Sequence, residues 1–238
     1  MKKFMDADFL LENEVAKKLY HDYAEHMPIY DYHCHISPAQ IAANHKFENI
    51  GELMLGGDHY KWRVMLSNGI DDKYIRGEGT WLEKWKAFAA SLKYCVGNPM
   101  YHWTHLELAR IFGVYDLLNP SSARAIYDEC SAKLQTEEYR GQALMRKFDV
   151  RVVCTTDDPA DSLEYHKQIK ENPFGTKVLP TWRPDKAMVV EKPEQYIEYI
   201  KKLSAAAGME INNYQDLLDA LRKRQDFFHE MGCRISDH

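Results

Sequence analysis

The sequence lacks the features that mark membrane-spanning, exported and nucleic-acid-binding proteins. No apolar run in its 238 residues approaches the ~20 residues that a membrane-spanning helix needs. The segment Met1–Asp6 has no apolar stretch of the kind found in signal peptides. The formal net charge of -5 provides no basic surface of the kind that binds nucleic acid. We therefore expect neither a membrane nor a nucleic-acid partner.

The sequence also lacks a pattern of paired cysteines. Its five cysteines are an odd number, and no two of them form a Cys-x-x-Cys motif. Scattered cysteines of this kind are typical of reduced thiols, so we expect a cytoplasmic protein. No internal repeat and no low-complexity segment is present, and the length suits one large domain or two small ones.

The run Pro28–Ser37 has the clearest potential for chemistry. It carries β-forming residues between a proline and a Ser-Pro step, which predicts one short buried strand. Residues two apart on a strand share a face, so His33 and His35 should point one way and Cys34 the other. Two parallel imidazoles can hold a divalent metal. They do not complete a tetrahedral site, so the alternative is one histidine in a core hydrogen bond and the other at the rim.

Helical and strand-like segments alternate along the rest of the chain. Residues 38–147 are mostly helical, and Thr80–Glu83 is a capping box that should open a helix running to Tyr94. The other predicted segments are an amphipathic helix over 8–27, strands over 148–156, 177–182 and 233–236, and helices over 159–170 (capped by Asp158), 193–208 and 214–231. This alternation predicts parallel βα units.

Polar residues follow each predicted strand. They are His33 and His35, then Thr155, Thr156 and Asp157, then Trp182 and Arg183, and finally Ser236, Asp237 and His238. Polar groups at the carboxyl ends of parallel strands are typical of a (β/α) barrel active site. A doubly wound sheet is the alternative, but no glycine-rich phosphate loop follows the first strand.

Two helical segments also carry side chains able to do chemistry. Gly56–Arg63 combines the general acid or base His59, the phenol of Tyr60 and two cations in one glycine-led loop. Its alternative is a solvated turn between helices. Asn98–His105 pairs imidazoles with aromatic rings, and here helix packing with a hydrogen-bonded His105 is the favoured interpretation.

Arg183 lies where a predicted strand ends between two prolines that stiffen the backbone. A guanidinium held in this way can bind a carboxylate with two parallel hydrogen bonds, which a flexible lysine does less well. The alternative is a surface salt bridge to Asp185.

Five segments taken together resemble the uronate isomerases, also called glucuronate isomerases, a divergent branch of the amidohydrolase superfamily. They occur in the same order and at similar spacing in that family: Tyr30–His35, Gly57–Arg63, Gly97–Leu108, Cys154–Pro159 and Arg183–Lys186. The resemblance covers essentially the whole chain.

The resemblance implies a metal-containing (β/α)8 TIM barrel with a helical insertion after the first strand. It implies an aldose–ketose isomerisation that interconverts D-glucuronate with D-fructuronate and D-galacturonate with D-tagaturonate, so we expect a small hexuronate substrate. Carried over by motif, His33 and His35 bind a divalent metal, for which we expect zinc. His59 and Tyr60 are then catalytic candidates lining the substrate site, and Arg183 lies near the sugar acid.

The length departs from the family. Its members are nearly twice as long and carry a further metal-binding aspartate after their eighth strand. Residues 1–238 should therefore form one N-terminal portion, about the first half of a barrel, with 38–147 as the helical insertion. Unpaired strand edges predict self-association, so we expect a homo-oligomer. Two other functions stay open, namely metal-dependent hydrolysis and a catalytically silent half-barrel.

Overall fold

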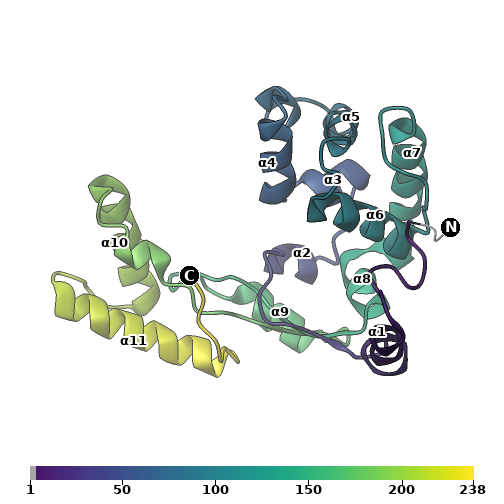
Figure 1. The fold of residues 1–238 in the computed structure, drawn as a ribbon. Coiled ribbons are helices and arrows are strands. Elements are labelled where there is room, and N and C mark those ends of the chain that lie inside the picture. The colour runs from purple at the N-terminus through teal and green to yellow at the C-terminus, as the bar shows by residue number, and fades with distance from the viewer. Residues whose placement is uncertain (1–3) are drawn as a thin grey trace. The chain divides into compact units, whose positions relative to one another are not determined.

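The computed structural model describes residues 4–238 and divides into two compact units. Unit 1 joins residues 1–27 to 46–140, and unit 2 joins residues 28–45 to 141–238. Each unit has its own hydrophobic clusters, and its elements are labelled in Figure 1. Within residues 4–238, no helix combines the length and the apolar character needed to cross a membrane.

Unit 1 is helical. Its elements are α1 (Glu14–Leu19), the π-helical turn η1 (Tyr20–Ala24), α3 (Ile50–Leu55), α4 (His59–Ser67), the 3-10 turn η2 (Asp72–Tyr74), α5 (Trp81–Leu92), α6 (Pro99–Phe112), α7 (Ala123–Leu134) and the 3-10 turn η3 (Glu137–Tyr139). The predicted capping box opens α5, because the Thr80 hydroxyl accepts from the Glu83 N–H and the Glu83 carboxylate accepts from the Thr80 N–H. Pro99 occupies the first position of α6, where its missing N–H costs no hydrogen bond and its fixed φ favours the start of a helix.

One continuous apolar cluster stabilises unit 1. Trp85 and Phe88 on α5 are fully buried in it, together with Leu108 on α6 and Leu134 on α7. The indole N–H of Trp85 donates to the carbonyl of Ala123 at 2.9 Å, so the ring adds no unpaired polar group to the core.

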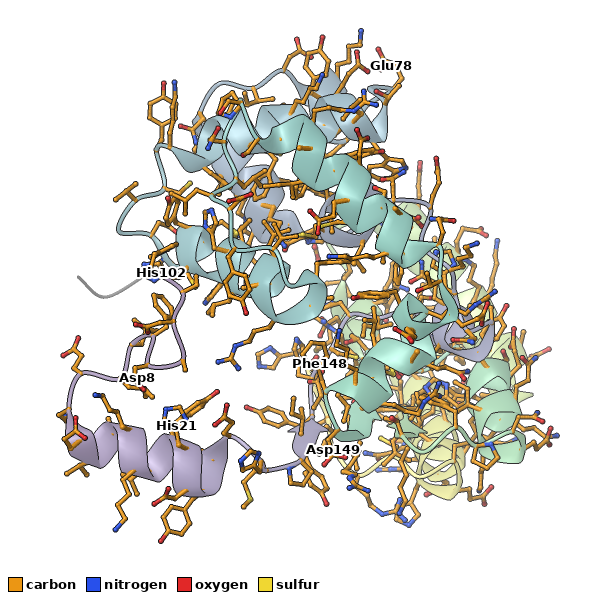
Figure 2. The ribbon with its side chains drawn as sticks, turned by 90° about the vertical axis from the view of Figure 1, so that its right-hand side faces the viewer. Asp8, His21, Glu78, His102, Phe148 and Asp149 are labelled. Atoms are coloured by element: carbon orange, nitrogen blue, oxygen red, sulfur yellow. The ribbon has the colours of Figure 1, made fainter. Side chains whose placement is uncertain are left out.

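The N-terminal helix differs from its prediction. The apolar spacing predicts one helix over 8–27, whereas the α-helix ends at Leu19 and continues as a π-helical turn. Its apolar side chains are exposed, with Val15 at 67% and Tyr23 at 58%. Figure 2 shows Asp8 and His21 side by side, and His21 Nε2 lies 3.0 Å from Asp8 Oδ1. Hydrogen bonding to His21 and then Lys17 lowers the pKa of the Asp8 carboxyl.

Unit 2 contains the predicted parallel sheet. Its strands are β1 (Ile29–Asp31), β2 (Val150–Cys154) and β3 (Lys177–Leu179), in the order β1-β2-β3 and all parallel. Beyond β3, Trp182 forms isolated parallel bridges to Asp157 and to Ser236. The strand predicted over 233–236 is thus present only as a single bridge.

Unit 2 also contains helical elements. They are α2 (Pro38–Ala42), α8 (Gly141–Lys147), α9 (Glu164–Glu171), the 3-10 turn η4 (Asp185–Met188), α10 (Pro193–Ala207) and α11 (Tyr214–Glu230). Figure 1 shows α10 and α11 as a helical pair, which packs through Tyr199, Leu203 and Ala220. The ends of α10 and α11 agree with the prediction, because Pro193 opens α10 and Gly208 ends it in the left-handed conformation.

Two local predictions in unit 2 were wrong. The helix expected from Pro159 begins instead at Glu164, because the Arg224 guanidinium donates to the carbonyls of Pro159 and Asp161 and holds that segment as a turn. The strand expected to be buried, β1, is largely exposed, with Tyr30 at 64%. Within residues 4–238, β1 pairs with β2 alone, so its other edge has no strand to cover it.

Candidate metal and substrate site

His33 and His35 follow directly after β1 rather than lying within it. The N–H of Cys34 donates to the carbonyl of Cys154 at 3.1 Å, so the backbone still follows β2 at this point. Cys34 is buried in an apolar cluster of unit 2, opposite the two histidines. The two imidazole rings lie edge to face, and their Nε2 atoms converge to 3.0 Å, as the shared face predicts.

The environment of Cys34 makes it a poor metal ligand. Burial raises the pKa of its thiol to about 11, so the sulfur stays protonated near neutral pH. Its role is to anchor the histidine segment on the apolar side of the sheet.

Asp237 completes the surroundings of His33. Its Oδ2 lies 2.9 Å from His33 Nδ1, at the bridge that joins Ser236 to the rest of the sheet. Partial burial acts to raise the pKa of Asp237, but the N–H of His238 and the charges of His33 and Arg183 outweigh it and lower that pKa. An ionised Asp237 favours a proton on Nδ1 of His33, which leaves a lone pair on Nε2.

The two histidines fit half of a metal site. Two ligands of a tetrahedral metal at 2.0–2.1 Å lie about 3.3 Å apart, close to the 3.0 Å between the Nε2 atoms. The carboxylate on the second nitrogen of His33 is the partner that metal-binding histidines usually have. Within residues 4–238, no group of three or more His, Cys, Asp or Glu side chains is arranged to hold a metal. His33 and His35 could thus serve as two ligands of a metal, and further ligands would come from elsewhere.

Arg183 lies next to this pair in unit 2. Its Nε donates to Asp185 at 2.9 Å, which is the salt bridge considered from the sequence, and its Nη1 lies 3.6 Å from Asp237. The side chain is 29% exposed. The guanidinium is therefore held beside His33 through their common neighbour Asp237, with part of its edge open to solvent.

His59 and Tyr60 belong to unit 1, and their contacts are described within that unit. They form the first turn of α4, capped by Asp58, so only the glycines before them form the expected loop. Both are exposed, and the His59 ring packs against Trp62 with centroids 5.0 Å apart. Lys61 is buried and pairs with Asp58 and Glu107, which fixes this turn against α6.

His105 has the structural role that the sequence favours. Its Nδ1 donates to the carbonyl of Tyr101 at 2.7 Å, and its Nε2 accepts from the N–H of Leu118 at 3.0 Å. Both ring nitrogens are satisfied in the core, so His105 is not available as a ligand.

The sequence names Asp237 and Asp157 only among the polar residues after predicted strands and gives neither a role of its own. Both follow predicted strands, and that position was the only signal available. Nothing local shows that Asp237 contacts His33, because the two are at opposite ends of unit 2 in sequence.

Comparison with known proteins places this chain in a family. The family profile described as glucuronate isomerase matches residues 1–238. The chain belongs to the glucuronate isomerase family. Two curated relatives of this family are the uronate isomerases of Bacteroides thetaiotaomicron, 55% identical over 240 residues, and of Caldanaerobacter subterraneus, 53% identical over 239. Each alignment covers 100% of this chain and 51% of the relative, so the chain spans about half their length.

Solved structures from the glucuronate isomerase family share the fold. The crystal structure of uronate isomerase from Thermotoga maritima matches with a TM-score of 0.94 and 38% identity, over 100% of this chain and 52% of that one. Glucuronate isomerase from Caulobacter crescentus matches with a TM-score of 0.88 and 27% identity, over 95% of this chain and 49% of that one. The resemblance found in the sequence is thereby confirmed.

Proposed function

We propose that the chain supplies the first half of a uronate isomerase with a (β/α) barrel architecture, including the helical insertion over residues 38–147. One observation carries the proposal. In a member of this family, the Nε2 atoms of His33 and His35 converge at the end of a parallel strand, beside Asp237 and Arg183. Strand ends are where such barrels assemble their active sites.

The proposed reaction moves a proton between two carbons of a hexuronate. A base removes the proton from C2 of the aldose, an enediol forms, and a proton returns to C1 while the C2 hydroxyl becomes the ketone. The negative charge that develops on the enediol needs stabilisation. A divalent ion, for which we propose zinc, supplies this Lewis-acid stabilisation when bound to His33 and His35.

Other residues of the chain would bind the hexuronate and transfer its protons. Arg183 would hold the C6 carboxylate of the sugar acid with paired hydrogen bonds. His59 and Tyr60 are side chains of the right type to transfer protons, and their exposure on α4 leaves both accessible. We assign neither of them as the base.

Further proposals concern assembly and location. The uncovered edge of β1 supports self-association, because its backbone groups can pair with another strand. All five cysteines are free thiols, which supports a reducing compartment such as the cytoplasm.

A chimeric polypeptide tests the proposed function. It joins residues 1–238 to the remaining half of the Bacteroides thetaiotaomicron relative, and it is assayed with zinc or manganese for ketose formation from D-glucuronate and D-galacturonate. We expect turnover of at least about one per second. His33→Ala should abolish it without unfolding the protein, since that histidine is exposed.

The same chimera distinguishes uronate isomerisation from metal-dependent hydrolysis. Metal-dependent hydrolysis would appear as cleavage of esters or lactones instead of ketose formation. A folded chimera that cleaves those substrates and leaves both uronates unchanged would contradict the proposal.

A further inference from the structure

Three polar side chains form a buried network at the end of β2. Thr155, Asp157 and His166 are exposed by only 1%, 4% and 3%. Thr155 Oγ1 donates to Asp157 Oδ2 at 2.7 Å and lies 2.8 Å from His166 Nε2. A threonine hydroxyl has one hydrogen, so His166 Nε2–H is the donor to Thr155 and the hydrogen bonds run in one direction.

Asp157 also fixes the backbone beyond β3. Its Oδ2 accepts from the Thr181 N–H at 3.1 Å, and its own N–H donates to the Thr181 carbonyl at 3.2 Å. Its carbonyl then accepts from the Arg183 N–H at 3.0 Å. Asp157 is thus bound through its carboxylate and through its backbone to the segment that carries the Arg183 side chain.

That segment in turn holds the last residues of the chain. The Trp182 N–H donates to the Ile235 carbonyl at 3.1 Å, and the Trp182 carbonyl accepts from the Asp237 N–H at 2.9 Å. The Asp237 carboxylate contacts His33 Nδ1 at 2.9 Å. A continuous series of hydrogen bonds and one ion pair therefore connects the buried carboxylate to His33.

We propose that Asp157, held by Thr155 and His166, is a positioning residue that fixes the Arg183 and Asp237 backbones and thereby orients His33. This role deepens the proposed function and rests on it, because His33 matters as a metal ligand only in that function. Asp157 touches neither metal nor substrate in this account. It acts by keeping the carboxylate of Asp237 at Nδ1 of His33, so that Nε2 faces His35.

Two threonines provide a matched experiment. Thr155→Val removes the hydroxyl that bonds Asp157 and His166. Thr181→Val removes a hydroxyl of equal burial that, within residues 4–238, has no hydrogen-bond partner. Thr155→Ser keeps the hydroxyl and serves as the rescue variant. Asp157→Asn, which keeps the shape and removes the charge, is the second variant in case Thr155→Val does not fold.

The first readout is amide hydrogen exchange in the 238-residue chain. In Thr155→Val we expect the amides of Arg183 and Asp237 to exchange about tenfold faster, as the loss of a hydrogen bond to a charged group predicts. Thr155→Ser and Thr181→Val should stay within about twofold of the unsubstituted chain. A network that only anchors α9 would instead speed exchange at Lys167 and Lys170 and leave Arg183 and Asp237 unchanged, which would overturn the proposal.

The second readout is a titration with zinc alone, carried to millimolar concentration because two imidazoles bind weakly. We expect Thr155→Val to weaken zinc binding about tenfold, with Thr181→Val unchanged. Equal zinc affinity in both variants would overturn the proposal. If the unsubstituted chain binds no zinc, its two histidines alone are insufficient, and exchange at Arg183 and Asp237 still decides the positioning role. Uronate turnover by the chimera separately decides the proposed function.

Discussion

The two units of this chain use different means to bury polar and apolar groups. Unit 1 has one continuous apolar cluster centred on Trp85 and Phe88. Unit 2 divides its apolar residues among three smaller clusters and places a polar network, Thr155–Asp157–His166, at the end of β2. Apolar burial is non-directional, whereas hydrogen bonds fix orientation. We infer that unit 2 is built to orient side chains at its strand ends.

Each unit also contains a buried histidine, and the two are satisfied differently. His105 in unit 1 has a backbone partner on both ring nitrogens. His166 in unit 2 bonds the Thr155 hydroxyl through Nε2, while its buried Nδ1 has no hydrogen-bond partner within residues 4–238. His105 therefore stabilises the packing of α6, whereas His166 belongs to a side-chain network.

The largest effect on the free energy of unfolding is expected from a substitution in the core of unit 1. Trp85→Ala should lower the free energy of unfolding by about 3–5 kcal/mol, because it empties a fully buried site and removes the hydrogen bond that the indole donates to the Ala123 carbonyl. Urea denaturation followed by circular dichroism measures this loss. Trp103→Ala, on the exposed face of α6, should cost no more than about 0.5 kcal/mol. Similar losses in both variants would show that Trp85 does not centre the core.

A smaller but more specific effect is expected in unit 2. Arg183→Lys in the chimera should raise KM for uronates about ten- to a hundredfold, corresponding to about 1.5–3 kcal/mol, because a point charge cannot form paired hydrogen bonds. Steady-state kinetics measures it. Arg151→Lys, an exposed arginine paired with Asp149, is the control and should leave KM unchanged. An unchanged KM in Arg183→Lys would assign that residue to its salt bridge with Asp185.

These predictions reflect what the sequence could and could not show. Capping signals such as Thr80, Pro193 and Gly208 are local, so the helices that they bound were predictable. His33 and His35 are neighbours on one backbone segment, and their convergence followed from strand geometry.

Contacts between distant segments were not predictable in the same way. The start of α9 depends on Arg224 in α11, whose guanidinium bonds the carbonyl of Pro159. The ion pair of His33 with Asp237 likewise depends on how the whole sheet assembles. A single sequence contains no local signal for either contact.

Acidification should lower stability through both buried histidines. Burial lowers the pKa of both His105 and His166. A lowered folded-state pKa gives stability that is present above the ordinary value of about 6.5 and is lost as pH falls through the folded value. Burial raises the pKa of Asp157, so its protonation at low pH acts in the opposite direction in unit 2.

We therefore expect His105→Gln and His166→Gln each to remove part of the stability loss between pH 7 and pH 5, because each removes an imidazole whose pKa burial lowers. Urea denaturation of each variant at both pH values is the measurement. An unchanged stability loss in either variant would contradict this account of its histidine.

The smallest effect on stability is expected at the surface of α4. Tyr60 is 65% exposed, so Tyr60→Phe should change the free energy of unfolding by less than about 0.5 kcal/mol. Asp58→Ala, which removes the helix cap two residues earlier, should cost about 0.5–2 kcal/mol. Thermal unfolding compares the two. If Tyr60 transfers protons, the chimera that carries Tyr60→Phe should lose turnover while its stability is retained.

The most direct test of the account is an assay of the 238-residue chain by itself beside the chimera. Each is purified, supplied with zinc or manganese, and followed for ketose formation from D-glucuronate. Within residues 4–238 the chain has only the two proposed metal ligands and an uncovered edge of β1, so we predict turnover by the chimera and none by the chain alone. Turnover near one per second by the chain alone, which lies within the usual range of enzymes, would contradict the account.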